Sequence, residues 1–205
     1  SDLGFAALED LARSYPQKSI APQALGQALE EGILLSSTRK GLWGTQYLNR
    51  ILSEYLTKDL SWRGHLPGTP VLVTANDPSL GINNGDRGLL VLEPRNGLEG
   101  ADRGFSPKVL FVMDGGVRAI PLGLIQAWQP GWAMTIHKAQ GSEYAKVAVL
   151  LPPNQAGHLN REILYTGITR AKEHCWLWSD EQTVLQALEN QTKRDSGIVQ
   201  GILQS

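Results

Sequence analysis

The sequence is poor in cysteine and contains no long apolar run. Cys175 is the single cysteine among 205 residues, which excludes a disulfide within the chain. No apolar stretch approaches the roughly 20 residues that a helix needs to cross a bilayer, and the first residues do not resemble a secretion signal. These absences predict a protein of the reducing cytoplasm that makes no membrane contact.

An excess of charge of one sign is also missing. The 19 Lys and Arg residues are balanced by 20 Asp and Glu residues, which leaves a formal net charge of -1. Without an overall positive field, any contact with nucleic acid must come from local clusters. Hydrophobic residues make up 41% of the chain, which is enough to bury a core.

A third absence is the G-x-x-x-x-G-K-[ST] loop, whose backbone cradles nucleotide phosphates in many α/β enzymes. The chain nowhere contains this loop, and it begins without Met, entering an amphipathic pattern within a few residues. We therefore expect an excised fragment. Any phosphate-directed motif found in it would form only part of a site.

The chain begins and ends in an α/β pattern. Leu25, Ala28 and Leu29 recur at helical spacing after Pro22, and Gly32 ends that helix. The apolar run that follows is typical of a strand buried on both faces. The same alternation returns after residue 127, with strands expected at 146–151 and 175–178 and a final helix capped by Ser179 with Gln182.

The middle of the chain has a different composition, rich in glycine, proline and turn residues. Tight-turn sequences at 83–86 and 114–116 separate short strand-like runs. These runs predict a small inserted β-barrel with strands at 70–75, 88–92, 108–113 and 117–120. The polar stretch 93–107 is expected to be a long, mobile loop.

Arg170 is the first candidate for chemistry. If residues 162–171 are helical, Leu164, Ile168 and Ala171 share a core-facing stripe, while Thr166 and Arg170 lie together on another face. A rigidly held guanidinium suits the charge that develops on a phosphoryl group during transfer. The alternative is an ordinary surface arginine paired with Glu162 or Glu173.

Residues 135–143 form a dense polar run before a buried strand. The hydroxyl of Thr135, the imidazole of His137 and backbone N–H groups suit phosphate positioning, and the carboxylate of Glu143 suits a ribose hydroxyl. The alternative is a plain loop in which Thr135 and Ser142 cap the backbone. Spacing alone leaves both interpretations open.

Arg39 and Lys40 follow a predicted strand, where α/β sheets place their ligands, although a solvated basic pair is the alternative. His174 beside Cys175 lacks metal-ligand spacing, so no metal site is expected. Among possible base-stacking residues, alternating Trp176 and Trp178 favour packing, whereas exposure is expected for Trp43 and Trp62.

Ordered motifs then carry a resemblance to a known family. Residues 132–143 (WAMTIHKAQGSE) resemble motif V of superfamily 1 DNA helicases, and residues 164–171 (LYTGITRA) resemble motif VI. Residues 38–44 (TRKGLWG) resemble motif IV of the RecD family, and residues 76–88 are similar to the SH3-like insertion of that family. The tail at 193–197 is similar to the end of the RecD subunit of exodeoxyribonuclease V.

This resemblance implies an α/β, RecA-like second motor domain (2A) of residues 1–62 and 127–205, with an inserted SH3-like β-barrel domain (2B) of residues 63–126. By position, Arg170 and Arg39 would act as catalytic contacts to the γ-phosphate, with Gly141 and Glu143 near the nucleotide sugar and phosphates. Single-stranded DNA would be touched by residues at two places in the chain: Thr135, His137, Lys138, Asn83 and Asn84. Alternatively, the two asparagines only form a turn and do not contact DNA.

The resemblance also implies cofactors and partners. ATP with Mg²⁺ would bind between two RecA-like domains, and the missing N-terminal motor domain would supply the Mg²⁺ ligands. The full-length protein would be a 5′-to-3′ helicase subunit of a RecBCD-type exodeoxyribonuclease V, working with RecB-like and RecC-like subunits in double-strand break repair and recombination. The fragment alone would be inactive. The alternatives are a stand-alone RecD-like or relaxase helicase, or a non-catalytic DNA- or protein-binding module.

Overall fold

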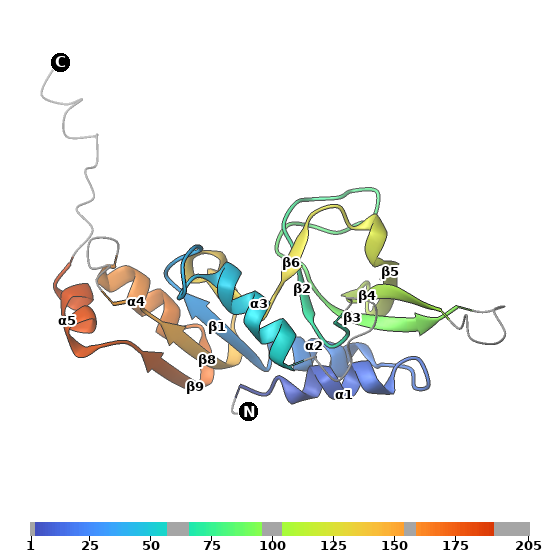
Figure 1. Ribbon diagram of the computed structural model, residues 1–205, viewed down its shortest axis with the longest axis horizontal. Coiled ribbons are helices and arrows are strands. Elements are labelled where there is room, and N and C mark those ends of the chain that lie inside the picture. Colours follow the sequence, from blue (N-terminus) through green and yellow to red (C-terminus); the bar gives the residue numbers. More distant parts are fainter. Residues whose placement is uncertain (1–2, 57–65, 96–103, 154–158, 191–205) are drawn as a thin grey trace, which may run out of the picture.

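A parallel sheet organises the two ends of the chain. The computed structural model describes residues 3–56, 66–95, 104–153 and 159–190 (Figure 1). The sheet has the strand order β7-β1-β8-β9, and every pairing in it is parallel. Its strands are β1 (Gly32–Ser36), β7 (Ala133–Thr135), β8 (Tyr144–Leu150) and β9 (Ala171–Trp178).

Helices cover both faces of this sheet, which confirms the predicted α/β class. On one face, Val147 and Val149 pack with Leu164 of α4 (Arg161–Ile168) and Ala187 of α5 (Glu181–Glu189). On the other face, Leu34 and Ala148 pack against α3 (Thr45–Leu56). All five residues of β1 are buried, as expected for a strand covered on both sides.

The caps of the last two helices come from short polar side chains. The Asn160 side chain accepts a hydrogen bond from Ile163 N at 2.8 Å at the start of α4. At α5, the Asp180 carboxylate accepts from both the N–H and the hydroxyl of Thr183, at 2.8 and 2.7 Å. The predicted cap at Ser179 is therefore one residue too early, because the charged Asp180 is the stronger acceptor.

An antiparallel sheet occupies the middle of the chain, with the strand order β5-β4-β3-β2-β6. The four predicted strands all belong to it. A turn with positive φ at Asp114 (50°) and Gly115 (76°) joins β4 to β5, as the tight-turn sequence predicts. The strands are β2 (Pro70–Val73), β3 (Arg87–Pro94), β4 (Phe105–Met113), β5 (Gly116–Pro121) and β6 (Trp128–Pro130), with a 3₁₀ turn, η2 (Leu122–Leu124), after β5.

Two predicted limits of this region differ from the structure. The loop expected at 93–107 is shorter, because Glu93 pairs with Ser106 and Pro94 with Phe105 in the β3–β4 ladder. Residues 96–103 of it lie outside the described residues. β6 pairs with β2, so the antiparallel sheet extends past residue 126 to Pro130. Partly buried, less apolar strand ends give too weak a pattern to be recognised in sequence.

The two N-terminal helices pack beneath the antiparallel sheet rather than on the parallel one (Figure 1). α1 (Ala6–Ser14) contributes Leu8 and α2 (Pro22–Glu30) contributes Leu25 to a cluster with Leu89 and Leu110. The middle of the chain is therefore covered on one face by α1 and α2. Among the described residues, no helix is long and apolar enough to cross a membrane.

Candidate functional site

Residues of the two strongest motifs meet at the end of the parallel sheet where its strands begin, which we call the amino edge. β8 and β9 begin side by side, because Tyr144 pairs with Ala171. The residues just before each strand, Glu143 and Arg170, therefore lie at the same edge. Tyr144 N also donates to Arg170 O at 2.9 Å, which ties the two segments together.

Arg170 is held by three protein acceptors. Its Nε donates to Thr166 O at 3.1 Å, Nη1 to Ser142 O at 3.0 Å and Nη2 to Thr169 Oγ1 at 3.3 Å. Each terminal nitrogen keeps a further N–H that, among the described residues, has no acceptor. The half-buried guanidinium is thus fixed in place with donors still available.

The helix that carries motif VI is shorter than expected. α4 ends at Ile168, and Arg170 lies in the turn between α4 and β9. Ile168 is 40% exposed, so the predicted core stripe is wrong at this position, and buried Leu164 and Gly167 form it instead. A Cβ on Gly167 would contact Ile136 and Val149 at 3.4 Å, which shows how closely α4 approaches the sheet. The shorter helix places Arg170 directly against the loop that contains Ser142.

The loop before β8 is exposed and turns at a glycine. Gly141 has φ +84°, a conformation that favours glycine because other residues are strained there. The Glu143 carboxylate lies 3.7 Å from Lys172 Nζ, and both side chains are more than half exposed. A cavity of about 490 Å³ opens beside this loop, and its wall includes Gly141, Ser142 and Glu143.

A second group of predicted residues lies at the opposite end of the sheet, where its strands finish, which we call the carboxyl edge. Ser36 pairs with Thr135, so the loops that follow β1 and β7 emerge together. Thr135 caps the 3₁₀ turn η3 (Ile136–Ala139) by accepting from Lys138 N at 3.4 Å, as the capping alternative expects. His137 and Lys138 are exposed on that turn.

The loop with Arg39 is well ordered by its own hydrogen bonds. Ser36 Oγ donates to Trp43 O at 2.7 Å, and Gln46 N at the start of α3 donates to Arg39 O at 3.2 Å. Gly41 has φ +85°, which lets the loop turn sharply. The Arg39 side chain is exposed, on the loop that leaves β1 three residues after Ser36, the partner of Thr135.

The structure does not bring Arg39 and Arg170 together. Arg39 follows a strand and Arg170 precedes one, so in a parallel sheet the two residues lie at opposite edges. The seven-residue strand β8 between these edges spans roughly 20 Å at about 3.3 Å per residue. The two guanidiniums therefore face different surfaces. Similarity to motifs could not show this, because it says nothing of strand direction.

Asn83 and Asn84 are exposed in the turn before β3, and their backbones shape that turn. Asn83 N donates to Asp86 Oδ2 at 2.7 Å, and Asn84 N donates to Asn76 Oδ1 at 2.8 Å. Asn84 also lines a cavity of about 290 Å³ together with Lys138 and Gln140. The turn role is therefore present, and the Asn84 side chain lies near the η3 turn.

Sequence reasoning about the tryptophans was only partly right. Trp43 is 41% exposed as expected, whereas Trp62 lies outside the described residues. Trp178 is 55% exposed, contrary to the packing expectation, because β9 is an edge strand. Trp176 is half-buried beside His174, with ring centroids 4.3 Å apart. Sequence reasoning also missed Ser142 and Thr166 as acceptors for Arg170, because backbone carbonyls leave no trace in sequence.

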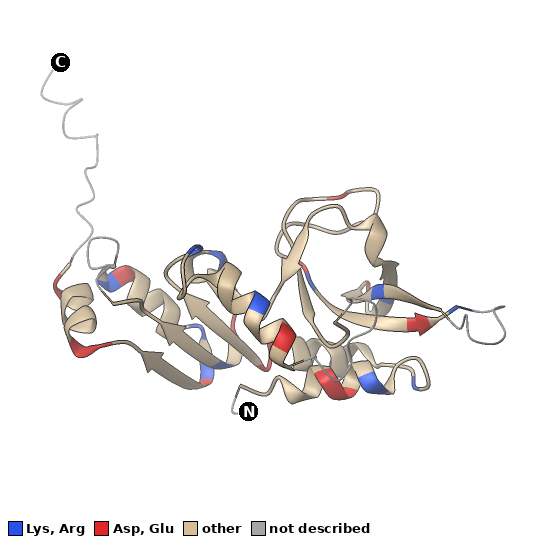
Figure 2. Ribbon diagram, in the orientation of Figure 1, with Lys and Arg blue, Asp and Glu red and all other residues tan. Residues whose placement is uncertain are grey.

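Charged residues of both signs are distributed over both sheets and their helices rather than gathered by sign (Figure 2). This agrees with the net charge of -1. Any binding of a polyanion must therefore depend on local groups such as those at the two edges.

Comparison with known proteins identifies the class. The family model described as "UvrD-like helicase C-terminal domain" matches residues 130–178, which contain β7, β8, α4 and β9. A solved structure of Pif1 helicases at forked DNA covers 99% of this chain, and the chain covers 53% of it, with a TM-score of 0.50 and 16% identity. That likeness concerns the fold alone. The parallel sheet and the helices that cover it therefore have the fold of a RecA-like helicase domain.

Sequence relatives narrow the class to one family. The RecD subunit of the RecBCD enzyme from Mycolicibacterium smegmatis is 35% identical over 173 residues, which are 83% of this chain and 29% of that protein. The Haemophilus influenzae RecD subunit is 32% identical over 169 residues, or 80% of this chain and 24% of that protein. The chain belongs to the RecD family of superfamily 1 helicases, and it spans less than a third of the relatives it matches.

Proposed function

We propose that the full-length protein is an ATP-dependent DNA helicase in which this chain forms one wall of the ATP cleft. The observation that carries the proposal is that the Arg170 guanidinium is held by hydrogen bonds to Thr166, Thr169 and Ser142. Ser142 belongs to the same loop as Gly141 and Glu143. A guanidinium held in this way loses little freedom when it contacts a phosphate, so it suits transition-state charge stabilisation.

The amino edge has groups that fit a nucleotide. The N–H groups of Arg170 without an acceptor suit phosphate oxygens, and the exposed Glu143 carboxylate suits a ribose hydroxyl. Gly141 lets the backbone approach closely. ATP would supply the phosphoryl group that is hydrolysed, and residues outside this chain would hold its Mg²⁺, because the sequence has no P-loop.

The carboxyl edge fits a nucleic-acid strand. Exposed Arg39 and Lys138 can contact phosphates, and Thr135 and His137 add hydrogen-bonding groups beside them. We assign Arg39 to this edge rather than to the γ-phosphate, because it follows β1, whose last residue Ser36 pairs with Thr135. The turn with Asn83 and Asn84 extends the track toward the antiparallel sheet. Single-stranded DNA is the proposed ligand of this edge.

The two sheets support a division into two domains. We propose that the parallel sheet belongs to domain 2A and the antiparallel sheet to an SH3-like domain 2B. The pairing of β6 with β2 favours a boundary after Pro130 rather than after residue 126. Helices α1 and α2 form the base of 2B, because they pack on β3 and β4.

Replacing Arg170 tests the proposal in the full-length protein. Arg170→Ala is expected to lower the rate constant of ATP hydrolysis about 10³-fold, because the transition-state charge loses its fixed partner. Arg170→Lys is expected to be nearly as slow, since an ammonium cannot hold the same contacts. Steady-state ATPase assays with single-stranded DNA measure both.

The matched control is Arg13→Ala, which removes an exposed guanidinium that pairs with Glu9 on α1, away from this edge. It should change the hydrolysis rate by no more than about twofold. All variants should keep their affinity for single-stranded DNA, and the 205-residue chain alone should show no turnover. Normal hydrolysis by Arg170→Ala would refute the role of Arg170.

The family membership supports a RecBCD-type assembly. Relatives from several bacteria are named RecD subunits of the RecBCD enzyme, so we infer RecB-like and RecC-like partners, exodeoxyribonuclease V activity, 5′-to-3′ movement and a role in cytoplasmic double-strand break repair. A second candidate is a stand-alone helicase. The ATP-dependent RecD2 DNA helicase of Deinococcus radiodurans is 30% identical over 145 residues, which are 68% of this chain and 19% of that protein. Co-purification of RecB-like and RecC-like subunits with the tagged full-length protein distinguishes the two.

A further inference from the structure

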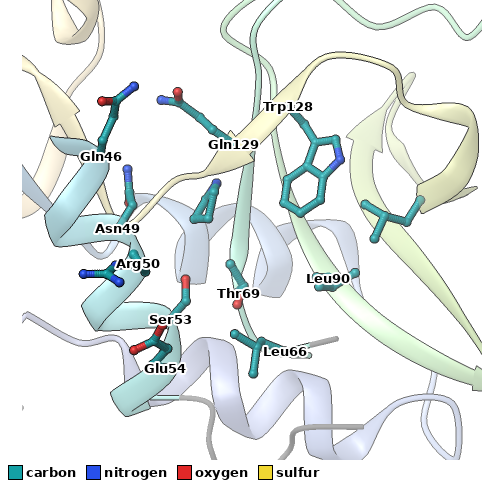
Figure 3. Close-up of a pocket in the computed structure, with 12 residues that line it drawn as sticks. Gln46, Asn49, Arg50, Ser53, Glu54, Leu66, Thr69, Leu90, Trp128 and Gln129 are labelled. Atoms are coloured by element: carbon teal, nitrogen blue, oxygen red, sulfur yellow. The ribbon is translucent and has the colours of Figure 1, made fainter. Parts of the chain in front are cut away.

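A cavity of about 580 Å³ lies between helix α3 and the antiparallel sheet (Figure 3). One wall is the face of α3 that carries Gln46, Asn49 and Arg50. The opposite wall comes from β6 with Trp128 and Gln129, from Leu90 of β3, and from Thr69 just before β2. A cavity of this size is within the range of small-ligand sites.

The two walls differ in chemistry. Trp128, Leu90 and Leu122 give the sheet side an apolar surface with one half-buried indole. The side chains of Gln46 and Gln129 lie at the rim, and each carboxamide offers both a donor and an acceptor (Figure 3). An apolar slot with an aromatic face and amide groups at its rim fits a flat heteroaromatic ring.

A buried hydroxyl in the wall has no partner. Thr69 is 2% exposed, and its Oγ1 makes no hydrogen bond with any described residue. The buried polar groups of α3 are satisfied by contrast: the Asn49 amide bonds both the N–H and the carbonyl of Ala133 at 2.8 Å, and Ser53 Oγ accepts from Trp132 Nε1 at 2.9 Å. The Thr69 oxygen has almost no accessible surface, so a ligand in the cavity does not reach it, and the amides of Gln46 and Gln129 at the rim are the polar groups left to a ligand.

The mouth of the cavity adjoins the carboxyl edge of the parallel sheet. Gln46 lies in the first turn of α3, and its N–H bonds Arg39 O. On the other side, β6 leads through Gly131 and Trp132 into β7, which ends at Thr135. A strand that lies along Arg39 and Thr135 therefore passes the rim of this cavity.

We propose that the cavity receives an unstacked base of single-stranded DNA, with the ring against Trp128 and its polar edge toward the Gln46 and Gln129 amides. This inference rests on the proposed strand-binding role of the carboxyl edge. The base enters while its phosphate stays outside near Arg50, because Glu54 in the same wall repels a buried phosphate. Carboxamides can bond the edge of any base, so the site holds bases without strict sequence preference.

The test compares strands with and without bases. The full-length protein, without ATP and at fixed low salt, is titrated against a fluorescent thymidine oligonucleotide of about 12 nucleotides and against an abasic strand of equal length. Trp128→Leu is expected to weaken binding of the thymidine strand about tenfold, and binding of the abasic strand by less than about twofold. Trp178→Leu removes an exposed indole outside the cavity and is the matched control, expected to change neither affinity.

Thr69→Val is a second control, because its buried hydroxyl does not reach the cavity. Removing a hydroxyl without a partner among the described residues should leave the melting temperature unchanged or raise it. The same variant should bind both strands as the parent protein does. Weaker binding of the thymidine strand alone by Trp128→Leu supports the inference. Unchanged binding of the thymidine strand by Trp128→Leu overturns it, and would leave the cavity to another occupant such as a protein side chain.

Failure of this inference is distinguishable from failure of the strand-binding proposal. Arg39 contacts phosphates in that proposal, so Arg39→Ala should weaken the binding of both strands equally. If Arg39→Ala weakens neither strand, the carboxyl edge is not the strand track. If Arg39→Ala behaves as expected but Trp128→Leu weakens the binding of both strands equally, the strand-binding proposal is kept and the base site is refuted.

Discussion

Arg39 and Arg170 carry the same side chain in two different surroundings. Arg170 follows a helix and is fixed by three acceptors, whereas the Arg39 side chain is exposed on a loop and has no hydrogen-bond partner among the described residues. A fixed guanidinium suits transition-state stabilisation, and an exposed one suits contact with a mobile, charged strand. At the scale of single residues, the proposed roles therefore follow from how each guanidinium is held.

Arg39→Ala should separate strand binding from chemistry. Loss of one phosphate contact is expected to weaken single-stranded DNA binding several-fold and to reduce the slope of log affinity against log salt by about 0.7. The hydrolysis rate at saturating DNA should change by less than about twofold. Salt titrations with fluorescence anisotropy and ATPase assays measure both; a large loss of hydrolysis at saturating DNA would return Arg39 to the nucleotide site.

Helices α1 and α2 show at the scale of elements how the first 30 residues are attached. Apolar residues of both helices pack on β3 and β4, and one polar contact joins three elements. Glu93 of β3 accepts from the Tyr15 hydroxyl at 2.9 Å beside the end of α1, and it pairs with Lys108 of β4. The hydrogen bond from Lys108 is the main reason that the pKa of Glu93 lies below its usual value, and burial is the main cause that raises the pKa of Tyr15 to about 12.

The contact predicts an acid-sensitive part of the stability. Because the pKa of Glu93 is lower in the folded chain, its contribution is present above the usual carboxyl pKa of about 4.3 and is lost as pH falls through the folded value. Glu93→Gln should therefore melt below the parent chain at neutral pH, and this difference should shrink as pH falls below about 4. Thermal melts over this range measure it.

Glu173→Gln is the control for that measurement, since Glu173 is exposed on β9, away from these contacts. Its melting difference from the parent chain should stay near zero at every pH. A difference for Glu93→Gln that does not vary with pH would show that its ionisation contributes nothing to the fold. The raised pKa of Tyr15 has the opposite sign, so its contribution is lost only in strong alkali, as pH rises toward about 12.

At the scale of the whole molecule, Arg87 joins the two sheets. From the start of β3 it donates to Leu29 O at the end of α2, and to Gly131 O at 3.1 Å on the segment that enters β7. Its guanidinium also lies 5.3 Å from the ring centre of Tyr144, the first residue of β8. Burial lowers the pKa of Arg87, which shows that this position is costly for a charge and must be compensated by those contacts.

Arg87→Lys is expected to destabilise the chain by about 2 kcal/mol, because an ammonium cannot span both carbonyls as a guanidinium does. Arg118→Lys is the matched control on the same sheet, since exposed Arg118 has Leu80 O, at 2.9 Å, as its one acceptor within the described part of the chain. It should cost less than about 1 kcal/mol. Chemical denaturation measures both free energies of unfolding, and equal losses would refute the joining role of Arg87.

Sequence predicted the elements far better than their contacts. The apolar run of β1 and the tight turn at Asp114 and Gly115 depend on neighbouring residues, so both were predictable. The end of α4 was not, because the closing turn at Thr169 and Arg170 is stabilised by Ser142, which is 28 residues away. The partnerless Thr69 hydroxyl likewise has no sequence signature, since only the packing of distant segments buries it.

The sequence by itself determined the class of this protein: local patterns and ordered motifs were enough for an α/β helicase domain with an inserted β unit. The tertiary structure decided which motif residues meet. Parallel strands send the loops before and after them to opposite edges, so Arg170 joins Glu143 while Arg39 joins Thr135. The folding of α3 against the antiparallel sheet also formed a cavity from residues that are far apart in the chain. Strand direction and long-range packing are properties of the folded backbone, and no short stretch of sequence encodes them.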